Sequence, residues 1–296
     1  MEIDHRKLIA EPGNDIRLED YDTGYTGNFT SKKKARKKLK SDAKRTAALQ
    51  KRLYAANRHS LLIIFQGIDA SGKDGTIRHV MSRINPQGCE VYSFKTPSTE
   101  ELQHDFLWRT TRRMPPRGKI GIFNRSYYEE VLITRVHPEF ILNQNIPGIF
   151  TAADIDERFW EKRYSHINNF EEHQSDSGTV ILKFFLHLSK QEQKARFLSR
   201  IDNDKKNWKF TISDINERNM WDTYQHAFET AINKTSTPWA PWYIIPADNK
   251  WFMRTAVASI LVETLEELDP KFPRTDPEQK KSLLEARELL LQEGRK

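Results

Sequence analysis

The sequence has few of the features that define secreted or membrane proteins. Cys89 is the only cysteine among 296 residues, so no disulfide can form within the chain. As a small residue at the start of a predicted strand, Cys89 is expected to be buried and not catalytic. No apolar run approaches the ~20 residues that span a bilayer, and the first six residues, MEIDHR, lack a signal-peptide core. We therefore expect a soluble, cytoplasmic protein with no membrane partner.

The histidines are not spaced as zinc ligands. None belongs to a pattern such as His-Glu-x-x-His, so we do not expect a zinc site. Helical spacing places Trp160, Tyr164, Ile167 and Phe170 on one face of a helix, which is typical of core packing.

Acidic residues are outnumbered. The chain has 41 Asp and Glu against 48 Lys and Arg, a net charge of +7, which favours anionic partners. The densest basic run, KKKARKKLK at 32–40, leads into a helical pattern through Leu49, Leu53 and Tyr54. Such a run forms either a solvated helix face or a surface that binds substrate, and the sequence leaves both interpretations open.

Apolar runs alternate with amphipathic segments from residue 60 onward, the pattern of a parallel sheet with helices on both faces. We predict strands at 61–66, 90–94, 119–123, 179–188 and 242–246. Helices are predicted near 73–83, 100–113, 153–173, 190–201, 213–233 and 250–268, with an appended amphipathic helix at 277–293. The prediction is an α/β fold with a five-stranded parallel sheet.

The chain divides into three parts by composition. Residues 1–58 form a polar arm and a basic helix, residues 59–270 form the α/β domain, and residues 271–296 form a C-terminal helix. A mobile lid is expected around residues 196–212.

A glycine-rich turn, GIDASGK at 67–73, directly follows the first predicted strand and precedes a helix. Such a loop turns backbone N–H groups inward, the helix adds its positive end, and Lys73 adds a full charge. A chance glycine-rich turn is the alternative, but the strand and helix on either side favour a phosphate-binding loop. Its candidate phosphate-binding residues are Gly67, Ala70, Gly72, Lys73, Asp74 and Gly75.

The residue after Lys73 departs from the general phosphate-loop pattern. Asp74 occupies the place of a Ser or Thr whose hydroxyl ligates magnesium, so another oxygen must do so. Asp69, Asp74 and Thr76 are the nearby candidates. We expect Mg²⁺, with Mn²⁺ as a substitute, at Asp69.

Polar residues follow the ends of all five predicted strands. In a parallel sheet these ends face one crevice, where ligands bind. Arg125 follows the third strand and is expected either to clamp phosphate oxygens or to form a structural salt bridge. Asn124, beside it, offers only a neutral amide to a metal, which leaves the larger share to Asp69. The residues expected at the crevice are Gly67, Asp69, Lys95, Asn124, Arg125, Ser189, Lys190 and Asp248.

A basic segment near residue 200 is the candidate lid. Arg196 and Arg200 are four residues apart and therefore share a helix face. With the lysines that follow, they could close over a polyanion and exclude water. An ordinary charged helix face is the alternative. The candidate lid residues are Arg196, Arg200, Lys205, Lys206 and Lys209.

Five ordered motifs resemble the second family of polyphosphate kinases. They are GIDASGKDG at 67–75, FKTPS at 94–98, FNRSYYE at 123–129, WK at 208–209 and PADNK at 246–250. The resemblance extends from about residue 60 to residue 268. Asp74 after the lysine, unusual in other phosphate-binding loops, is similar to what this family has.

The resemblance implies a thymidylate kinase-like fold and phosphoryl transfer from inorganic polyphosphate to AMP or ADP, reversibly. It implies that Asp69, Lys73 and Arg125 are catalytic, that the arginines and lysines from 196 to 209 form the lid, and that the protein is a homodimer or homotetramer. Asn124 with Glu129 resembles the branch that accepts AMP as well as ADP. The products and substrates would be AMP, ADP and ATP.

Two other functions are compatible with parts of the sequence. An ATP-dependent nucleoside monophosphate kinase shares the loop and the sheet, but a basic lid favours a longer polyanion as donor. A nucleic-acid-binding protein could use residues 32–45, but it leaves the loop and lid without a purpose and lacks a recognised binding motif.

Overall fold

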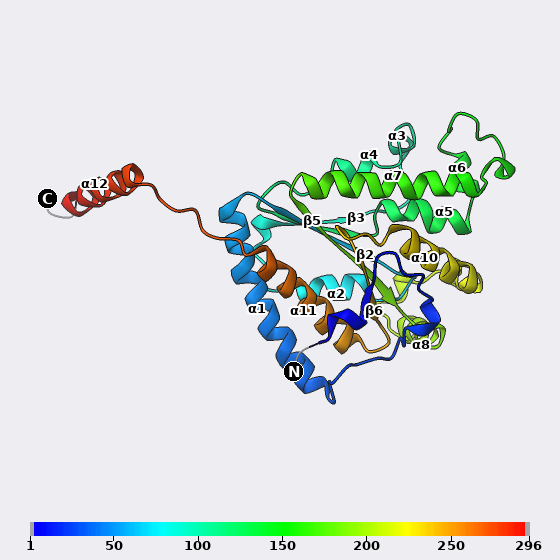
Figure 1. The fold of residues 1–296 in the computed structure, drawn as a ribbon. Coiled ribbons are helices and arrows are strands. Elements are labelled where there is room, and N and C mark those ends of the chain that lie inside the picture. Colours follow the sequence, from blue (N-terminus) through cyan, green and yellow to red (C-terminus); the bar gives the residue numbers. More distant parts are fainter. Residues whose placement is uncertain (1–2, 294–296) are drawn as a thin grey trace.

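The computed structural model describes residues 3–293. A central sheet with the strand order β1-β6-β5-β2-β4-β3 is covered by helices on both faces (Figure 1). Its strands are β1 (Ile9–Ala10), β2 (Ser60–Gln66), β3 (Cys89–Ser93), β4 (Ile120–Asn124), β5 (Thr179–His187) and β6 (Trp242–Pro246). The five predicted strands are confirmed to within two residues at either end.

The sheet is not wholly parallel as predicted, because it has a sixth strand. β1 pairs antiparallel with β6, with Ile9 opposite Tyr243 and Ala10 opposite Trp242, whereas the other pairs are parallel. A strand of two residues is too short for an alternating hydrophobic pattern, so β1 could not be predicted from the sequence. Its role is local: it covers the backbone edge that β6 would otherwise expose.

Longer helices surround the sheet. They are α1 (Lys32–Ala56), α2 (Lys73–Val80), α7 (Glu157–Asp176), α8 (Lys190–Ile201), α9 (Ser213–Asn219), α10 (Trp221–Thr235), α11 (Lys250–Leu268) and α12 (Pro277–Glu293). Shorter ones are α3 (Thr99–Leu102), α4 (Trp108–Thr111), α5 (Ile133–Val136) and α6 (Glu139–Leu142).

Two predicted helices are divided in the structure. The segment 100–113 forms α3 and α4, because the Asp105 carboxylate accepts from the Leu107 N–H at 2.9 Å and makes a turn between them. The segment 213–233 is interrupted at Met220 and forms α9 and α10. The hydrophobic periodicity of the sequence continues through both breaks, so it predicted one helix in each segment.

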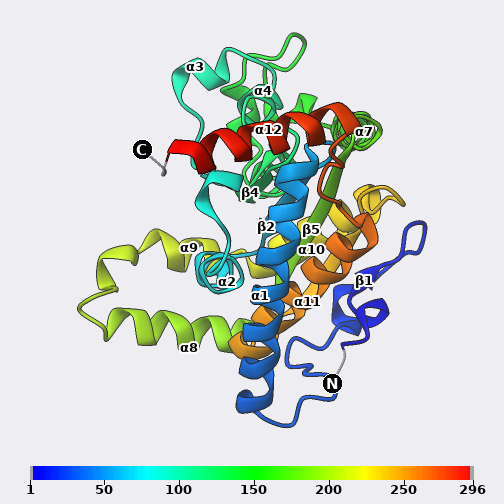
Figure 2. The same cartoon turned by 90° about the vertical axis from the view of Figure 1, so that its left-hand side faces the viewer.

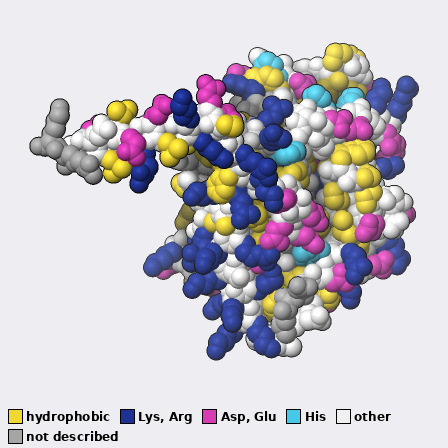
Figure 3. Space-filling model, turned by 60° about the vertical axis from the view of Figure 1, so that its left-hand side comes forward, with side chains coloured by type: hydrophobic (Ala, Val, Ile, Leu, Met, Phe, Trp, Pro, Cys, Tyr) yellow, Lys and Arg dark blue, Asp and Glu magenta, His cyan; other side chains and the backbone are white. Residues whose placement is uncertain are grey.

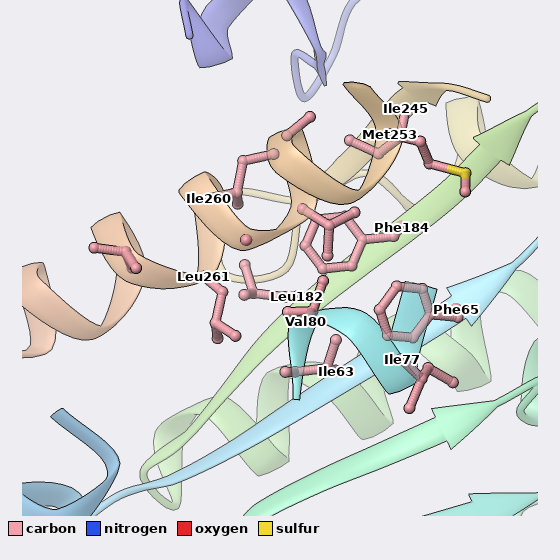
Figure 4. Close-up of a cluster of buried hydrophobic side chains, with 14 of the residues drawn as sticks. Ile63, Phe65, Ile77, Val80, Leu182, Phe184, Ile245, Met253, Ile260 and Leu261 are labelled. Atoms are coloured by element: carbon pink, nitrogen blue, oxygen red, sulfur yellow. The ribbon is translucent and has the colours of Figure 1, made fainter. Parts of the chain in front are cut away.

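Alternating side chains of the buried strand β2 enter two different cores. Ile63 and Phe65 pack with Ile77 of α2 and Met253 of α11 on one face (Figure 4). Ile64 packs on the opposite face with residues of α7 and α10, among them Trp160 and Phe228. A central strand buried on both faces is typical of parallel sheets.

The N-terminal helix belongs to the first of these layers. α1 packs along α11 through Ala35, Leu49 and Leu53, while its basic residues remain outside (Figure 2). By contrast, α12 lies apart from the body at the end of an extended stretch, and none of its residues is buried (Figure 1). No helix within residues 3–293 is long and apolar enough to cross a membrane.

The strand order reverses beside β2. The chain passes from β2 to β3 and β4 on one side of it, and then to β5 and β6 on the other. At this reversal the connections leave a crevice beyond the carboxyl ends of β2, β4 and β5. The sheet therefore brings the loop after β2 together with the residues after β4.

Candidate active site

The loop between β2 and α2 has a backbone that few residues can adopt. Gly67 has φ +150°, and a Cβ there would lie 2.9 Å from Ser71 Oγ and 3.0 Å from the Leu186 carbonyl oxygen. Ala70 has φ +62°, a left-handed conformation that is strained for a residue with a side chain. The loop ends at the N-terminus of α2, whose first N–H groups have no partner within the helix. It therefore forms a preorganised anion site.

Lys73, the first residue of α2, has no carboxylate partner within 4 Å among the described residues. Its Nζ donates to the carbonyl oxygens of Gly67 at 2.5 Å and Ile68 at 3.3 Å. Burial, and next the nearby Arg125 guanidinium, lower the pKa of Lys73 to about 8. The ammonium group is thus held at the loop with much of its charge uncompensated.

Arg125 follows β4 in a left-handed conformation, with φ +63°. Its backbone N–H donates to the Phe65 carbonyl at 3.0 Å, which ties the residue to the end of β2. The guanidinium donates to Asp69 Oδ1 at 3.1 Å and to Glu129 Oε2 at 3.4 Å. Since its side chain remains 34% exposed, the salt bridges orient Arg125 without covering it.

Glu129 is the second carboxylate that binds the Arg125 guanidinium. Burial raises the pKa of Glu129, while Arg125 and then Lys73 oppose the rise. The carboxylate charge in turn raises the pKa of Arg125. Glu129 therefore acts on Arg125, and its position in a buried cavity keeps it away from the loop's open side.

A fully buried polar network fixes the segment that carries Arg125 and Glu129. Glu171 Oε1 accepts from the hydroxyls of Tyr127 at 2.7 Å and Tyr128 at 2.9 Å. Lys183 Nζ donates to Glu171 Oε2 at 2.6 Å, to Tyr128 Oη at 2.8 Å and to a backbone carbonyl of α10 at 2.7 Å. Every polar group has a partner, so the network is a rigid support.

Asp74 occupies the place where other phosphate-binding loops have a metal-binding hydroxyl, and Asn124 holds its carboxylate in position. Asn124 Nδ2 donates to Asp74 Oδ1 at 2.7 Å and joins β4 to the start of α2. Thr76, the third predicted source of a metal-binding oxygen, is fully buried and donates to the Gly72 carbonyl at 3.0 Å. Thr76 is therefore not available to a ligand of the cleft.

The structure separates the two arginines that were assigned together to the lid. Arg196 is only 7% exposed, and its guanidinium donates to the carbonyl oxygens of Ala70 and Ser71, each at 2.9 Å. It also donates to the carbonyls that follow β6 and to Glu192. With its donors used internally, Arg196 supports the loop from beneath, whereas Arg200 is half-buried and faces the cleft.

The lysines after α8 also differ. Lys209 Nζ lies 3.8 Å from Asp74 Oδ2, across the opening from α2. Lys206 lines the same opening, but Lys205 does not. Lys206 and Lys209 therefore lie where a lid would contact a bound anion, and Lys205 faces solvent.

These residues enclose a cleft of about 720 Å³. Most of the predicted site residues line it, and Lys250 and Asp214 are additions that sequence reasoning missed as cleft residues. Its charged lining comprises eight Lys or Arg and three Asp: Lys73, Lys95, Arg125, Arg196, Arg200, Lys206, Lys209, Lys250, Asp69, Asp74 and Asp214. Such an excess of cations favours a highly charged anion.

A smaller cavity of about 50 Å³ lies on the other side of Asp69 and Arg125 and shares these two residues and Asp214 with the cleft. Gly67 and Glu129 line this cavity instead of the cleft. Its other walls come largely from α9 and α10 and include Glu217, Arg218, Trp221, Tyr224 and Phe228. Burial, and next the Glu217 carboxylate, raise the pKa of Tyr224. The aromatic residues are spaced by three and four along α10. The sequence predicted this helix, but it did not predict that these residues line a cavity.

Within residues 3–293, no three His, Cys, Asp or Glu side chains gather as a metal site. Mg²⁺, however, usually keeps several waters and binds through one or two carboxylates together with substrate phosphates. Asp69 is 37% exposed at the cleft, with one oxygen engaged by Arg125. This donor set fits a magnesium ion that arrives with phosphate ligands, and it does not fit a permanently bound metal.

Comparison with known proteins gives a consistent result. A family profile described as Polyphosphate kinase 2 (PPK2) matches residues 29–273. The chain is 49% identical over 291 residues to an ADP-polyphosphate phosphotransferase of Rhodopseudomonas palustris, covering 98% of this chain and 100% of that protein.

Two further relatives cover nearly the whole chain. An AMP/ADP-polyphosphate phosphotransferase of Meiothermus ruber is 42% identical over 281 residues, covering 95% of this chain and 100% of that protein. The crystal structure of polyphosphate kinase 2 from Arthrobacter aurescens TC1 superposes with a TM-score of 0.84 at 37% identity, covering 94% of each chain.

Proposed function

The chain belongs to the polyphosphate kinase 2 family, and we propose that it transfers phosphoryl groups from inorganic polyphosphate to AMP and ADP. It is a phosphotransferase with a phosphate-binding loop. The observation that supports this donor most directly is the cleft: eight cations line it, and seven of them remain when Arg196, whose guanidinium is bound to backbone carbonyls, is left out. The reaction is reversible, since a phosphoanhydride is formed as one is broken when ADP is the product or the acceptor.

We assign the two cavities to the two substrates. The cationic cleft holds the polyphosphate, and the smaller cavity, with its aromatic walls and few cations, receives the nucleoside of the acceptor. Asp69 and Arg125 belong to both, so the reacting phosphates would meet there. The cavity is smaller than a nucleoside, so the acceptor must widen it; α9, which has no buried residue, is the wall best able to move.

The chemistry follows from the charges. The acceptor's phosphate oxygen is already an anionic nucleophile, so no general base is needed. Lys73 and Arg125 stabilise charge on the transferred group and reduce repulsion between two polyanions. When bound, Mg²⁺ would be held by Asp69 and substrate oxygens and would neutralise phosphate charge; Mn²⁺ would substitute for it. Arg200, Lys206 and Lys209 would exclude water from the cleft.

The donor is tested directly by omitting ATP. Purified protein, magnesium, AMP and long-chain polyphosphate should yield ADP and then ATP, separated by chromatography. A matched reaction with AMP and ATP but without polyphosphate identifies an ATP-dependent monophosphate kinase. Products only in this second reaction would refute the proposed donor.

We also propose that the protein forms a homodimer or homotetramer. The support is α12, whose leucines at 283, 284, 289, 290 and 291 are all more than half exposed. Light scattering of the full chain and of a chain ending at residue 275 measures this. A monomer in both cases would contradict it.

A further inference from the structure

The basic run of α1 lies beside α11 near the cleft. Thr255 of α11 donates its hydroxyl to the Ala35 carbonyl of α1 at 3.3 Å, so the neighbouring residues Arg36 and Arg254 lie at the same level. Lys40, four residues after Arg36, shares its helix face. Figure 2 shows α1 and α11 side by side, and α2 packs against α11. The run is therefore not an isolated charged surface.

Arg254 connects this surface with the phosphate-binding loop. A Cβ at Gly75 would lie 3.2 Å from Arg254 Nη2, so the glycine lets the guanidinium approach the first turn of α2. His79 Nδ1 donates to the Gly75 carbonyl at 2.6 Å, which leaves Nε2 to accept from Arg254 Nη1 at 3.3 Å. One turn earlier on α11, Lys250 already lines the cleft. Basic side chains thus extend from Lys250 at the cleft to Arg254 beside Gly75.

We call Arg36, Lys40, Arg78 and Arg254 the outer track. None of the four forms an ion pair with a carboxylate of residues 3–293, whereas Lys38 and Arg45 on the same helix pair with Asp42. Burial lowers the pKa of Arg254, and the nearby positive charges of Arg78, Arg196 and Arg36 lower it further. Figure 3 looks toward this side, and Lys and Arg gather in its lower part.

Mutual repulsion among close cations opposes folding unless an anion binds them. We propose that the outer track binds the part of a long polyphosphate chain that extends beyond the cleft, so that long donors bind more tightly than short ones. This inference rests on the proposed function. Polyphosphate suits the track better than RNA does, because the track leads through Lys250 directly into the cationic cleft.

A triple variant tests the track without disturbing the buried contacts of Arg254. Arg36→Gln, Lys40→Gln and Arg78→Gln remove three exposed cations that make no side-chain hydrogen bond in the structure. The matched control, Lys51→Gln, Arg52→Gln and Arg58→Gln, removes three exposed cations at the far end of α1 and just beyond it, which pair with no carboxylate of the described residues. The change in net charge is the same in both.

The readouts are the KM for long-chain polyphosphate, the KM for tripolyphosphate, which is too short to leave the cleft, and the salt dependence of long-chain binding. We expect the triple variant to raise the long-chain KM about tenfold and to weaken its salt dependence, because three phosphate contacts are lost. The triple variant's KM for tripolyphosphate should stay within about twofold of the wild type, because this donor is too short to reach the outer track. Both KM values of the control should also stay within about twofold, because the control leaves the outer track intact.

The outcomes separate this inference from the proposed function. A wild type that makes no product from polyphosphate refutes the function itself. An active wild type whose long-chain KM is unchanged in the triple variant refutes only the track. An equal rise of the long-chain KM in the variant and the control would mean that net charge alone causes the effect, and would refute the track. Loss of RNA binding in filter assays, with the long-chain KM unchanged, would assign the surface to nucleic acid instead.

Discussion

Lys183 and Lys73 lie in the same domain, but, within the part of the chain that the structure describes, the charge of Lys183 is paired with a carboxylate and the charge of Lys73 is not. Lys183 is fully buried and has a carboxylate, a hydroxyl and a carbonyl as partners. Among residues 3–293, Lys73 has two loop carbonyls as partners and no carboxylate. The domain therefore pairs its charge where it must fix the backbone, and leaves charge uncompensated where it must meet phosphate.

The same contrast holds for whole regions. Beneath the segment 124–129 every polar group of the network around Glu171 is satisfied, whereas the cleft above it has many more cations than carboxylates. Variants of the two regions should consequently fail in different ways, the first in stability and the second in catalysis.

The largest effect is expected from breaking the buried pair. Lys183→Met leaves the Glu171 charge buried without its partner, which should lower the free energy of unfolding by about 3–5 kcal/mol. The double variant Lys183→Met with Glu171→Leu should recover only part of this loss, since both charges are gone but the hydroxyls of Tyr127 and Tyr128 lose their buried acceptor. Denaturant unfolding measures each. If the single variant proved as stable as wild type, the network would not be the support that its geometry indicates.

The next effect lies at the loop. Lys73→Ala should lower kcat by ~10² or more with little change in stability, because it removes transition-state charge stabilisation and breaks no buried pair. Asp69→Ala should act similarly. The control is Lys205→Ala, an exposed lysine outside the cleft, which should stay within about twofold of wild type. A folded Lys73→Ala enzyme with normal turnover would remove this lysine from the mechanism.

Arg196 and Arg200 sharpen the comparison within a single helix. Arg196→Lys loses several bonds to backbone carbonyls and should lower the free energy of unfolding by about 2 kcal/mol. Arg200→Lys should leave stability unchanged and raise only the KM for polyphosphate, by a few-fold, because lysine keeps the charge at the cleft but lacks the planar fork that binds two phosphate oxygens. Equal stability of the two variants would mean that the carbonyl contacts of Arg196 contribute little.

These two arginines also show what the sequence could and could not predict. Spacing of four residues placed both on one helix face, and this was right about the helix. It could not reveal that carbonyls from residues 70 and 247, far away in sequence, would enclose one guanidinium and not the other. Burial of a side chain depends on long-range packing, which periodicity does not encode.

The parts predicted best are those with strong local signals. The loop at 67–73 and the central strands follow from glycines and apolar runs that specify their own conformation. The smaller cavity was missed because Trp221 and Tyr224 look like core residues until β2 and β4 bring Asp69 and Arg125 beside them. The outer track was missed for the same reason, since Arg254 and Arg36 are joined only by packing of α11 on α1.

The smallest effect concerns pH and again separates catalysis from stability. Lys73 is charged below its folded pKa of about 8 and neutral above it. The kcat/KM for polyphosphate should therefore hold below pH 8 and then fall about tenfold per pH unit. Over the same range the contribution of Lys73 to stability has the opposite sign. The unfolded chain retains this proton up to the ordinary lysine pKa of 10.5, so stability rises with pH.

Lys73→Arg provides the control for the pH profile, because a guanidinium stays charged throughout this range. Its kcat/KM, although lower, should lack the decline above pH 8. A decline that persists unchanged in Lys73→Arg would have to arise from another group, and the uncompensated charge at the loop would then not be what limits the enzyme at alkaline pH.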